Sequence, residues 1–128
     1  MALEPGLSAS VGLTVTEADT AQALGSGDVP VLATPRLLAL AEAATVRATA
    51  RHLPSGSTTV GTRVSVAHLA PTPIGGTVTV TAELSTVDGR RLAFAVSATD
   101  GAGTPVAEGT VERTLVDRAR FLAKAGGA

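Results

Sequence analysis

The sequence contains no cysteine, no tryptophan and no tyrosine, and only two phenylalanines. Without cysteine there can be no disulfide framework, no cysteine-based zinc site and no cysteine nucleophile. The two histidines, His52 and His68, are too few for a histidine-rich metal site. The scarcity of aromatic residues argues against nucleic-acid recognition by base stacking, which needs aromatic platforms. Ten basic and eleven acidic residues give a formal charge of −1, so no overall field draws the chain towards nucleic acid or a membrane.

Aliphatic residues are abundant: 45% of the 128 residues are hydrophobic, and the mean hydropathy is +0.33. The length suits one domain, which we expect to span residues 1–128 with loose ends at 1–6 and 125–128. Its core must be built from valine, leucine, isoleucine and alanine. The chain does not open with a basic stretch followed by an apolar one, and no apolar run approaches the length of a membrane span. We therefore expect a cytoplasmic protein with no membrane partner.

One stretch, residues 31–52, has the length and regularity of a buried helix. Thr34 followed by Pro35 predicts the N-cap and the first turn, because the threonine oxygen can accept a backbone N–H and proline has none to lose. Apolar residues then cover more than a narrow stripe, which favours a helix wrapped by other elements. Glu42 lies near the middle, with no cation at helical spacing. The helical pattern alone leaves open whether this glutamate is solvated or functional.

Alternating apolar and polar residues predict strands on both sides of this helix. In the first strand after it, Val64, Val66 and His68 share one face. The segment 17–30 is rich in glycine and contains a proline, so we predict a loop or a short lid there. The predicted strands are 7–16, 58–69, 77–87, 90–99 and 105–116, and residues 117–124 either extend the last strand or form a final turn.

One strand, one apolar helix and a meander of four antiparallel strands have few compact arrangements. We predict an α+β fold in which a curved antiparallel sheet of about five strands wraps one long central helix, which is the hot-dog architecture. Such a sheet leaves edge strands exposed. We therefore expect edge-to-edge or face-to-face pairing into a homodimer, and the sequence leaves open whether such dimers pair further into tetramers.

Few side chains of this sequence can carry out chemistry. The candidates are Thr34, Glu42 and His68, because there is no phosphate-binding loop with a lysine, no GxSxG elbow and no HExxH motif. A hydroxyl, a carboxylate and an imidazole can together attack an acyl carbonyl and move a proton. Thr34 and Glu42 are about 12 Å apart along a helix, so one substrate touches both only by lying along the helix or by reaching them from a neighbouring subunit. Taken singly, Thr34 also fits an ordinary cap and His68 an ordinary core histidine.

Three segments resemble, in order and spacing, the fluoroacetyl-CoA thioesterase family of hot-dog proteins: VLATPRLLALAEAATVRA, GTRVSVAHLAPTPIGGTVTVTAELSTVDGRRLAFAVSATDG and AEGTVERTLVDRARFLAK. In that family a threonine opening the helix, a glutamate eight residues on and a histidine in a G-T-x-x-x-V-x-H context form the catalytic set. The resemblance, which covers roughly residues 31–124, places these roles on Thr34, Glu42 and His68. It also places on Gly61 a glycine close to the acyl group, whose backbone N–H would polarise the thioester carbonyl.

The resemblance implies hydrolysis of a small or medium acyl-CoA to free acid and CoA, with coenzyme A present only as part of the substrate and no other cofactor or metal. In the family, specificity for a fluorinated acyl group depends on aromatic lid residues just before the helix. Here that stretch is GSGDVPVL, without any phenylalanine. We therefore do not expect fluoroacetyl-CoA to be the physiological substrate, and a lid of small residues implies a wider or more open pocket.

The expected roles follow from the chemistry of the three groups. Glu42, if its aliphatic neighbours desolvate it, would act as base or nucleophile. Thr34 would position Glu42 or a water molecule, or attack the substrate itself. His68 would activate water or protonate the leaving thiolate, for which an unperturbed pKa near 6.5 is suitable.

The phosphates of CoA call for a basic surface. We expect it near the C-terminus or beside the two arginines of the turn at 88–91. The candidates are Arg113, Arg118, Arg120 and Lys124, with Arg90 and Arg91 as the alternative. Two other functions fit the same fold: an enoyl-CoA hydratase or dehydratase, which hydrates crotonyl-CoA without releasing thiol, and a non-catalytic binding module for acyl-CoA or another small ligand, which is stabilised by its ligand without turnover.

Overall fold

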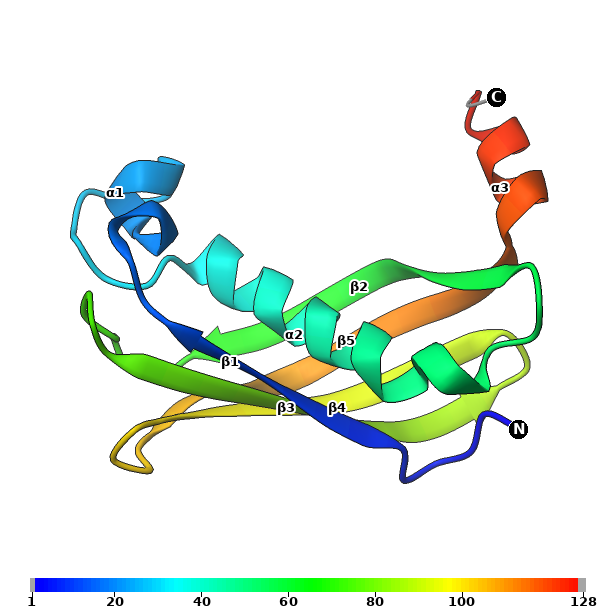
Figure 1. Cartoon of the computed structure of the whole chain (residues 1–128), viewed down its shortest axis with the longest axis horizontal. Coiled ribbons are helices and arrows are strands. Elements are labelled where there is room, and N and C mark those ends of the chain that lie inside the picture. The colour runs from blue at the N-terminus through cyan, green and yellow to red at the C-terminus, as the bar shows by residue number, and fades with distance from the viewer. Residues whose placement is uncertain (1, 127–128) are drawn as a thin grey trace.

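A computed structural model describes residues 2–126 of the chain (Figure 1). Five strands form one antiparallel sheet of order β1-β3-β4-β5-β2, which curls around the long helix α2. This confirms the predicted α+β hot-dog architecture. The strands are β1 (Ser8–Thr14), β2 (Ser57–His68), β3 (Thr77–Asp88), β4 (Arg91–Asp100) and β5 (Pro105–Asp117). The helices are α1 (Ala21–Leu24), α2 (Thr34–Thr49) and α3 (Arg118–Lys124), with 3-10 turns η1 (Glu17–Asp19) and η2 (Ala50–His52).

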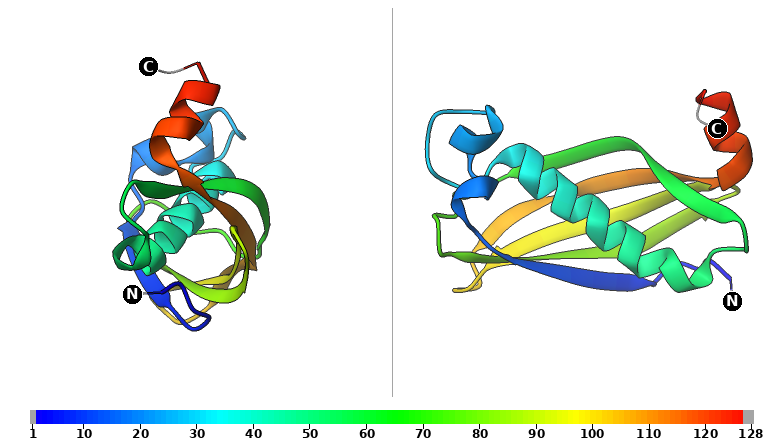
Figure 2. Two further views of the ribbon diagram at one scale, coloured as in Figure 1. Left: turned by 90° about the vertical axis from the view of Figure 1, so that its right-hand side faces the viewer. Right: turned by 45° about the horizontal axis from the view of Figure 1, so that its top comes forward.

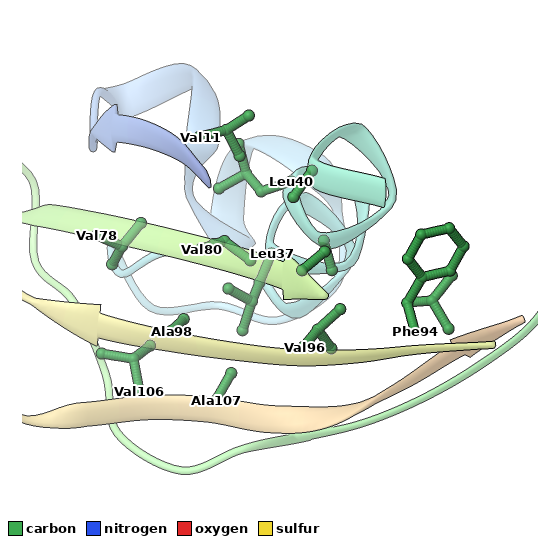
Figure 3. Close-up of a cluster of buried hydrophobic side chains, with 14 of the residues drawn as sticks. Val11, Leu37, Leu40, Val78, Val80, Phe94, Val96, Ala98, Val106 and Ala107 are labelled. Atoms are coloured by element: carbon green, nitrogen blue, oxygen red, sulfur yellow. The ribbon is translucent and has the colours of Figure 1, made fainter. Parts of the chain in front are cut away.

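The core lies between α2 and the concave face of the sheet, which wraps the helix when viewed along it (Figure 2). Every second residue of β4, and of β3 as far as Leu84, is turned towards α2, and beyond Leu84 a shift of register interrupts the alternation of β3. Figure 3 shows Leu37 and Leu40 of α2 beside Val80 and Val96 of the sheet. Alanines on the same side of α2 let the helix approach the strands closely. The fully buried side chains of this core include Leu32, Leu37, Val78, Leu84, Leu92, Phe94, Val106 and Val111.

The prediction of a four-strand meander is wrong for β2. Only β3, β4 and β5 are successive neighbours, while β2 pairs with β5 and β3 pairs with β1. The alternating pattern of each strand specifies which face is buried but not which strand lies beside it. Because the sheet must enclose α2 from both sides, the two strands that flank the helix in sequence, β1 and β2, become its two edges.

Two segments, one before the long helix and one at the end of the chain, are more regular than expected. Residues 17–24 form η1 and α1, and Gly25 ends α1 in a left-handed conformation with φ of 71°. A backbone bridge from Thr20 to Leu32 closes the segment that we call the lid, residues 20–31. At the C-terminus, residues 118–124 neither extend β5 nor form a simple turn. They form α3, because the Asp117 side chain accepts a hydrogen bond from Arg120 N and caps the helix.

The ends of the chain were predicted to be loose. Met1, Gly127 and Ala128 lie outside the described residues. Near the N-terminus, Leu3 packs against the core and Gly6 N donates to Leu84 O. No helix within residues 2–126 is long and apolar enough to cross a membrane.

Candidate active site

The first turn of α2 holds Thr34 against the end of β2. Thr34 Oγ1 lies 2.8 Å from His68 Nδ1. The prediction that Thr34 caps the helix is wrong, because Ala33 occupies the N-cap and Thr34 is the first helical residue. The helix needs no side-chain cap from Thr34, so its hydroxyl bonds to the imidazole instead. Thr34 and His68, which the resemblance assigns to one catalytic set, are therefore a hydrogen-bonded pair.

His68 is half-buried on the inward face of β2, together with Val64 and Val66 as predicted. Burial lowers the pKa of His68 from its ordinary value of 6.5, and the backbone of Ala70 opposes this change. The imidazole is therefore neutral at pH 7 and carries a single proton. Its Nε2 has no hydrogen-bond partner among the described residues. The Thr34 hydroxyl holds the ring through Nδ1, and because the imidazole is neutral it can take up a proton.

A cleft of about 340 Å³ opens at the Thr34–His68 pair. Small and aliphatic residues of the lid and of the chain after β2 form its walls, and this volume lies in the range of small-molecule sites. No aromatic side chain lines the cleft within the part of the chain that the structure describes, in agreement with the predicted lid of small residues. The lining residues besides the pair are Ala21, Ser26, Gly27, Val29, Val31, Leu32, Leu69, Ala70 and Pro71.

Glu42 lies in the middle of α2, and its partner comes from β5. Arg113 Nη1 donates to Glu42 Oε2 at 3.0 Å. The same guanidinium donates from Nε to Thr59 Oγ1 at 2.9 Å and from Nη2 to Thr59 O at 3.0 Å. The Arg113 side chain is only 7% exposed, whereas that of Glu42 is 39% exposed. A guanidinium that Thr59 anchors at two nitrogens therefore uses the third to fix a carboxylate that solvent or substrate can still reach.

This pairing changes two expectations from the sequence. Glu42 does have a cation, but Arg113 comes from a strand rather than from helical spacing on α2, and nothing in the local pattern could reveal it. The expectation that Arg113 contributes to an exposed basic surface is wrong, because its side chain is buried and directed to Glu42 and Thr59.

Gly61 of β2 lies directly against the carboxylate. A Cβ at this position would collide with Glu42 Oε2 and crowd Arg113 Nη1, so glycine is what lets the carboxylate and the guanidinium lie directly against β2. The pairing of β2 with β5 is also irregular between Gly61 and Arg63, which leaves Thr62 as an extra residue. Such bulges interrupt the ladder and often lie beside active sites. Backbone N–H groups near Gly61 are therefore candidates for polarising a carbonyl, the role that the resemblance implies.

The three candidate residues thus form two clusters rather than one. Thr34 and His68 meet at the lid end of α2, and Glu42 meets Arg113 and Gly61 about two turns further on, about 12 Å along the helix. No hydrogen bond or ion pair between residues 2 and 126 joins the two clusters. A reaction that uses all three residues must bring the clusters together in another way.

The other two arginines assigned to CoA are exposed residues of α3. Arg118 lines a cavity of about 350 Å³ that also contains Val46 and Thr59, close to the Glu42 cluster. Arg120 lines a smaller cleft of about 150 Å³ with Arg90. Their positions are compatible with the predicted basic surface, which stays a prediction.

Comparison with known proteins supports the resemblance read from the sequence. A family model described as fluoroacetyl-CoA-specific thioesterase matches residues 15–119. The fluoroacetyl-CoA thioesterase of Streptantibioticus cattleyicolor is 48% identical over 94 residues, which cover 73% of this chain and 67% of that protein. A solved structure of the fluoroacetyl-CoA thioesterase FlK superimposes with a TM-score of 0.90 at 38% identity, covering 98% of this chain and 97% of the other.

A second solved structure, a thioesterase superfamily member from Thermus thermophilus, has a TM-score of 0.90 at 27% identity, with 96% and 90% of the two chains covered. The fold, the order of the elements and the sequence therefore agree over nearly the whole chain. This chain belongs to the fluoroacetyl-CoA-specific thioesterase family.

Proposed function

We propose that the protein hydrolyses a small or medium acyl-CoA thioester to free acid and CoA, with Thr34, Glu42 and His68 as the catalytic set. The observation that carries the proposal is the 2.8 Å contact between Thr34 and a neutral His68 at a cleft of small-ligand size, in a chain of a thioesterase family. Coenzyme A enters only as part of the substrate, and the proposed chemistry uses side chains without a further cofactor. A CoA thioester is an intracellular metabolite, so we also place the protein in the cytoplasm.

We propose that a homodimer brings the two clusters together. β2 is an edge strand, and two copies of an edge strand can pair about a two-fold axis. In an antiparallel pair, the His68 end of one β2 would lie beside the first half of the other β2. That half contains Gly61, against which Glu42 of α2 lies. Each site would then take Thr34 and His68 from one subunit and Glu42 from its partner. The separation of the clusters within one chain supports this arrangement.

The proposed reaction begins with the thioester carbonyl near Gly61, where backbone N–H groups stabilise negative charge on its oxygen. The carboxylate of Glu42, held by Arg113, orients a water molecule towards the carbonyl carbon. His68 is neutral and takes one proton from this water as its oxygen bonds to carbon. When the carbon–sulfur bond breaks, the imidazolium returns that proton to the sulfur of CoA. Thr34 holds the imidazole in position through its hydrogen bond.

The cleft supports an aliphatic acyl group rather than a fluorinated two-carbon group. Val29, Val31 and Leu69 offer apolar surface beside the Thr34–His68 pair, and no aromatic ring from residues 2–126 narrows the space. Each CH₂ of an acyl chain that is buried against these walls contributes about 0.8 kcal/mol of binding free energy, so longer aliphatic chains should bind more tightly. We expect the rate to rise from acetyl-CoA towards short and medium aliphatic acyl-CoAs.

A thiol-trapping assay over a panel of acyl-CoAs, with fluoroacetyl-CoA and crotonyl-CoA included, tests the proposal. We expect thiol release from aliphatic acyl-CoAs and no preference for fluoroacetyl-CoA. Hydration of crotonyl-CoA without thiol release would indicate a hydratase instead. Stabilisation by acyl-CoA without any turnover would indicate a binding module.

A further inference from the structure

The short helix α3 projects from the end of the sheet, at the opposite end of the molecule from α1 and the lid (Figure 1). None of its residues is buried. It carries Phe121, which is 39% exposed, whereas the other phenylalanine of the chain, Phe94, is completely buried. The single exposed aromatic ring of residues 2–126 therefore lies on an element that contributes nothing to the core.

Phe121 borders a cleft of about 150 Å³ between α3 and the turn that joins β3 to β4. Three cationic side chains line this cleft: Arg120 and Lys124 from α3, and Arg90 from the turn. None of the three forms an ion pair within residues 2–126. The one acidic residue of the cleft, Asp117, already accepts the hydrogen bond from Arg120 N that caps α3. The cleft thus combines an aromatic face with an excess of positive charge.

The backbone holds both walls of this cleft in place. Arg118 N donates to Gly56 O at 2.9 Å, which ties the start of α3 to the chain before β2. Leu115 N donates to Arg90 O at 2.8 Å, which ties the turn to β5. β5 runs directly from Arg113 to the cap of α3, and four residues of strand span about 13 Å. The cleft therefore lies at a fixed separation from the Glu42 cluster.

We propose that this cleft binds the nucleotide end of CoA, with the adenine stacked on Phe121 and the phosphates bound by Arg90, Arg120 and Lys124. This inference rests on the proposed function, which supplies CoA as part of the substrate. Every nucleobase presents a face on which an aromatic ring can stack, and arginine and lysine form charge-assisted hydrogen bonds with phosphate. The flexible pantetheine arm then spans the distance from the α3 cleft to the thioester at Glu42 and Gly61.

The test compares two substrates that carry the same acyl group, the acyl-CoA and the N-acetylcysteamine thioester, which lacks the nucleotide. We expect F121A and the double variant R120A/K124A to raise KM for the acyl-CoA roughly tenfold or more, in line with stacking measured by alanine substitution. Values of kcat/KM for the N-acetylcysteamine thioester stay at the parental level. R47Q removes one positive charge from the β1 side of α2 and serves as the control, with KM unchanged for both substrates.

Calorimetric titration with adenosine 3′,5′-bisphosphate gives a readout that does not depend on hydrolysis. We expect binding that F121A and R120A/K124A each weaken and that R47Q leaves unchanged. Activity on both thioesters with equal KM changes, or none, would overturn the nucleotide site while leaving the hydrolase intact. If no thioester is hydrolysed, the titration alone decides: binding lost in F121A supports the site, and no binding overturns it. Competition by pyrophosphate as strong as by the bisphosphate would show that Phe121 does not read the base.

Discussion

Thr34 and Glu42 lie on the same helix, yet their surroundings are built in opposite ways. The Thr34–His68 pair has one hydrogen bond between neutral groups, and His68 Nε2 has no partner within residues 2–126. Around Glu42, one buried guanidinium makes three hydrogen bonds and a glycine permits close contact. The first arrangement leaves a proton free to move, whereas the second fixes a negative charge. This difference supports our proposal that the two clusters supply different parts of one reaction.

The largest expected effect comes from removing the reacting group of either cluster. Glu42→Gln keeps the shape of the side chain but removes its charge, and His68→Ala removes the base. We expect each to lower kcat/KM by at least about a hundredfold, the scale of general acid–base contributions, in the thiol-trapping assay. Glu108→Gln, which changes an exposed carboxylate on β5, is the matched control. Near-parental rates in both variants would show that neither cluster is catalytic.

Gly61→Ala should disturb the Glu42–Arg113 pair and leave the Thr34–His68 pair intact. The added Cβ collides with Glu42 Oε2, so the carboxylate must move away from Arg113 Nη1. Because the displaced atom is the tip of a side chain that is 39% exposed, we expect a loss of no more than about 1 kcal/mol in the free energy of unfolding, but a fall in kcat of roughly tenfold or more. Denaturant unfolding and steady-state kinetics measure the two effects. Gly12→Ala on β1, where a Cβ meets only ordinary contact, is the control. Unchanged stability and kcat would contradict the close packing at Gly61.

The low-pH side of the pH–rate profile should report the protonation of His68. Burial places the pKa of His68 below 6.5, so the imidazole is uncharged and able to act as a base above that lowered value. We expect kcat/KM to be constant near pH 7 and to fall as the pH decreases through a value below 6.5, with one proton taken up. The profile is measured from pH 4.5 to 8 with a substrate that does not titrate. A midpoint of this fall at or above pH 6.5 would contradict a desolvated His68.

The smallest effect concerns the base of the lid. The Asp19 carboxylate accepts hydrogen bonds from Thr16 N and Arg36 Nε, and these contacts lower its pKa from 3.8. The stabilisation is therefore complete above about pH 4 and is lost as the pH falls through the lowered folded pKa. We expect Asp19→Asn to lower Tm by a few degrees at pH 7 and to match the parent near pH 2, as measured by calorimetry. An equal difference at both pH values would assign the effect to packing rather than to charge.

The sequence predicted which residues form the long helix and the strands better than it predicted which strands lie side by side. Alternation identified the inward faces of β2, β3 and β4, and the apolar helix required a sheet that wraps it. Neither pattern could show that β2 pairs with β5, because strand pairing depends on how the whole sheet closes around α2. The capping role of Asp117 was visible in principle, since an Asp before a helix-forming stretch is an N-cap signal, but the stretch 118–124 was too short to stand out.

For the candidate site, too, the sequence predicted the residues but not the contacts between them. Residue type and resemblance selected Thr34, Glu42, His68 and Gly61, and the structure places them in two clusters. The partnership of Glu42 with Arg113 joins residues 71 positions apart, and no local spacing predicts it. Arg113 was predicted to be a surface cation because it lies in sequence near Arg118, Arg120 and Lys124, the basic residues close to the C-terminus. In the structure its side chain turns inward and binds Thr59 and Glu42.

Mixing two inactive variants tests most directly whether the clusters of different subunits form one site. T34A/H68A and E42Q are co-expressed with different affinity tags, and the mixed dimer is isolated and assayed for thiol release. If each site combines Thr34 and His68 of one subunit with Glu42 of its partner, one of the two sites in the mixed dimer is intact, and about half of the parental activity returns. Activity no higher than that of the two variants alone would contradict the account.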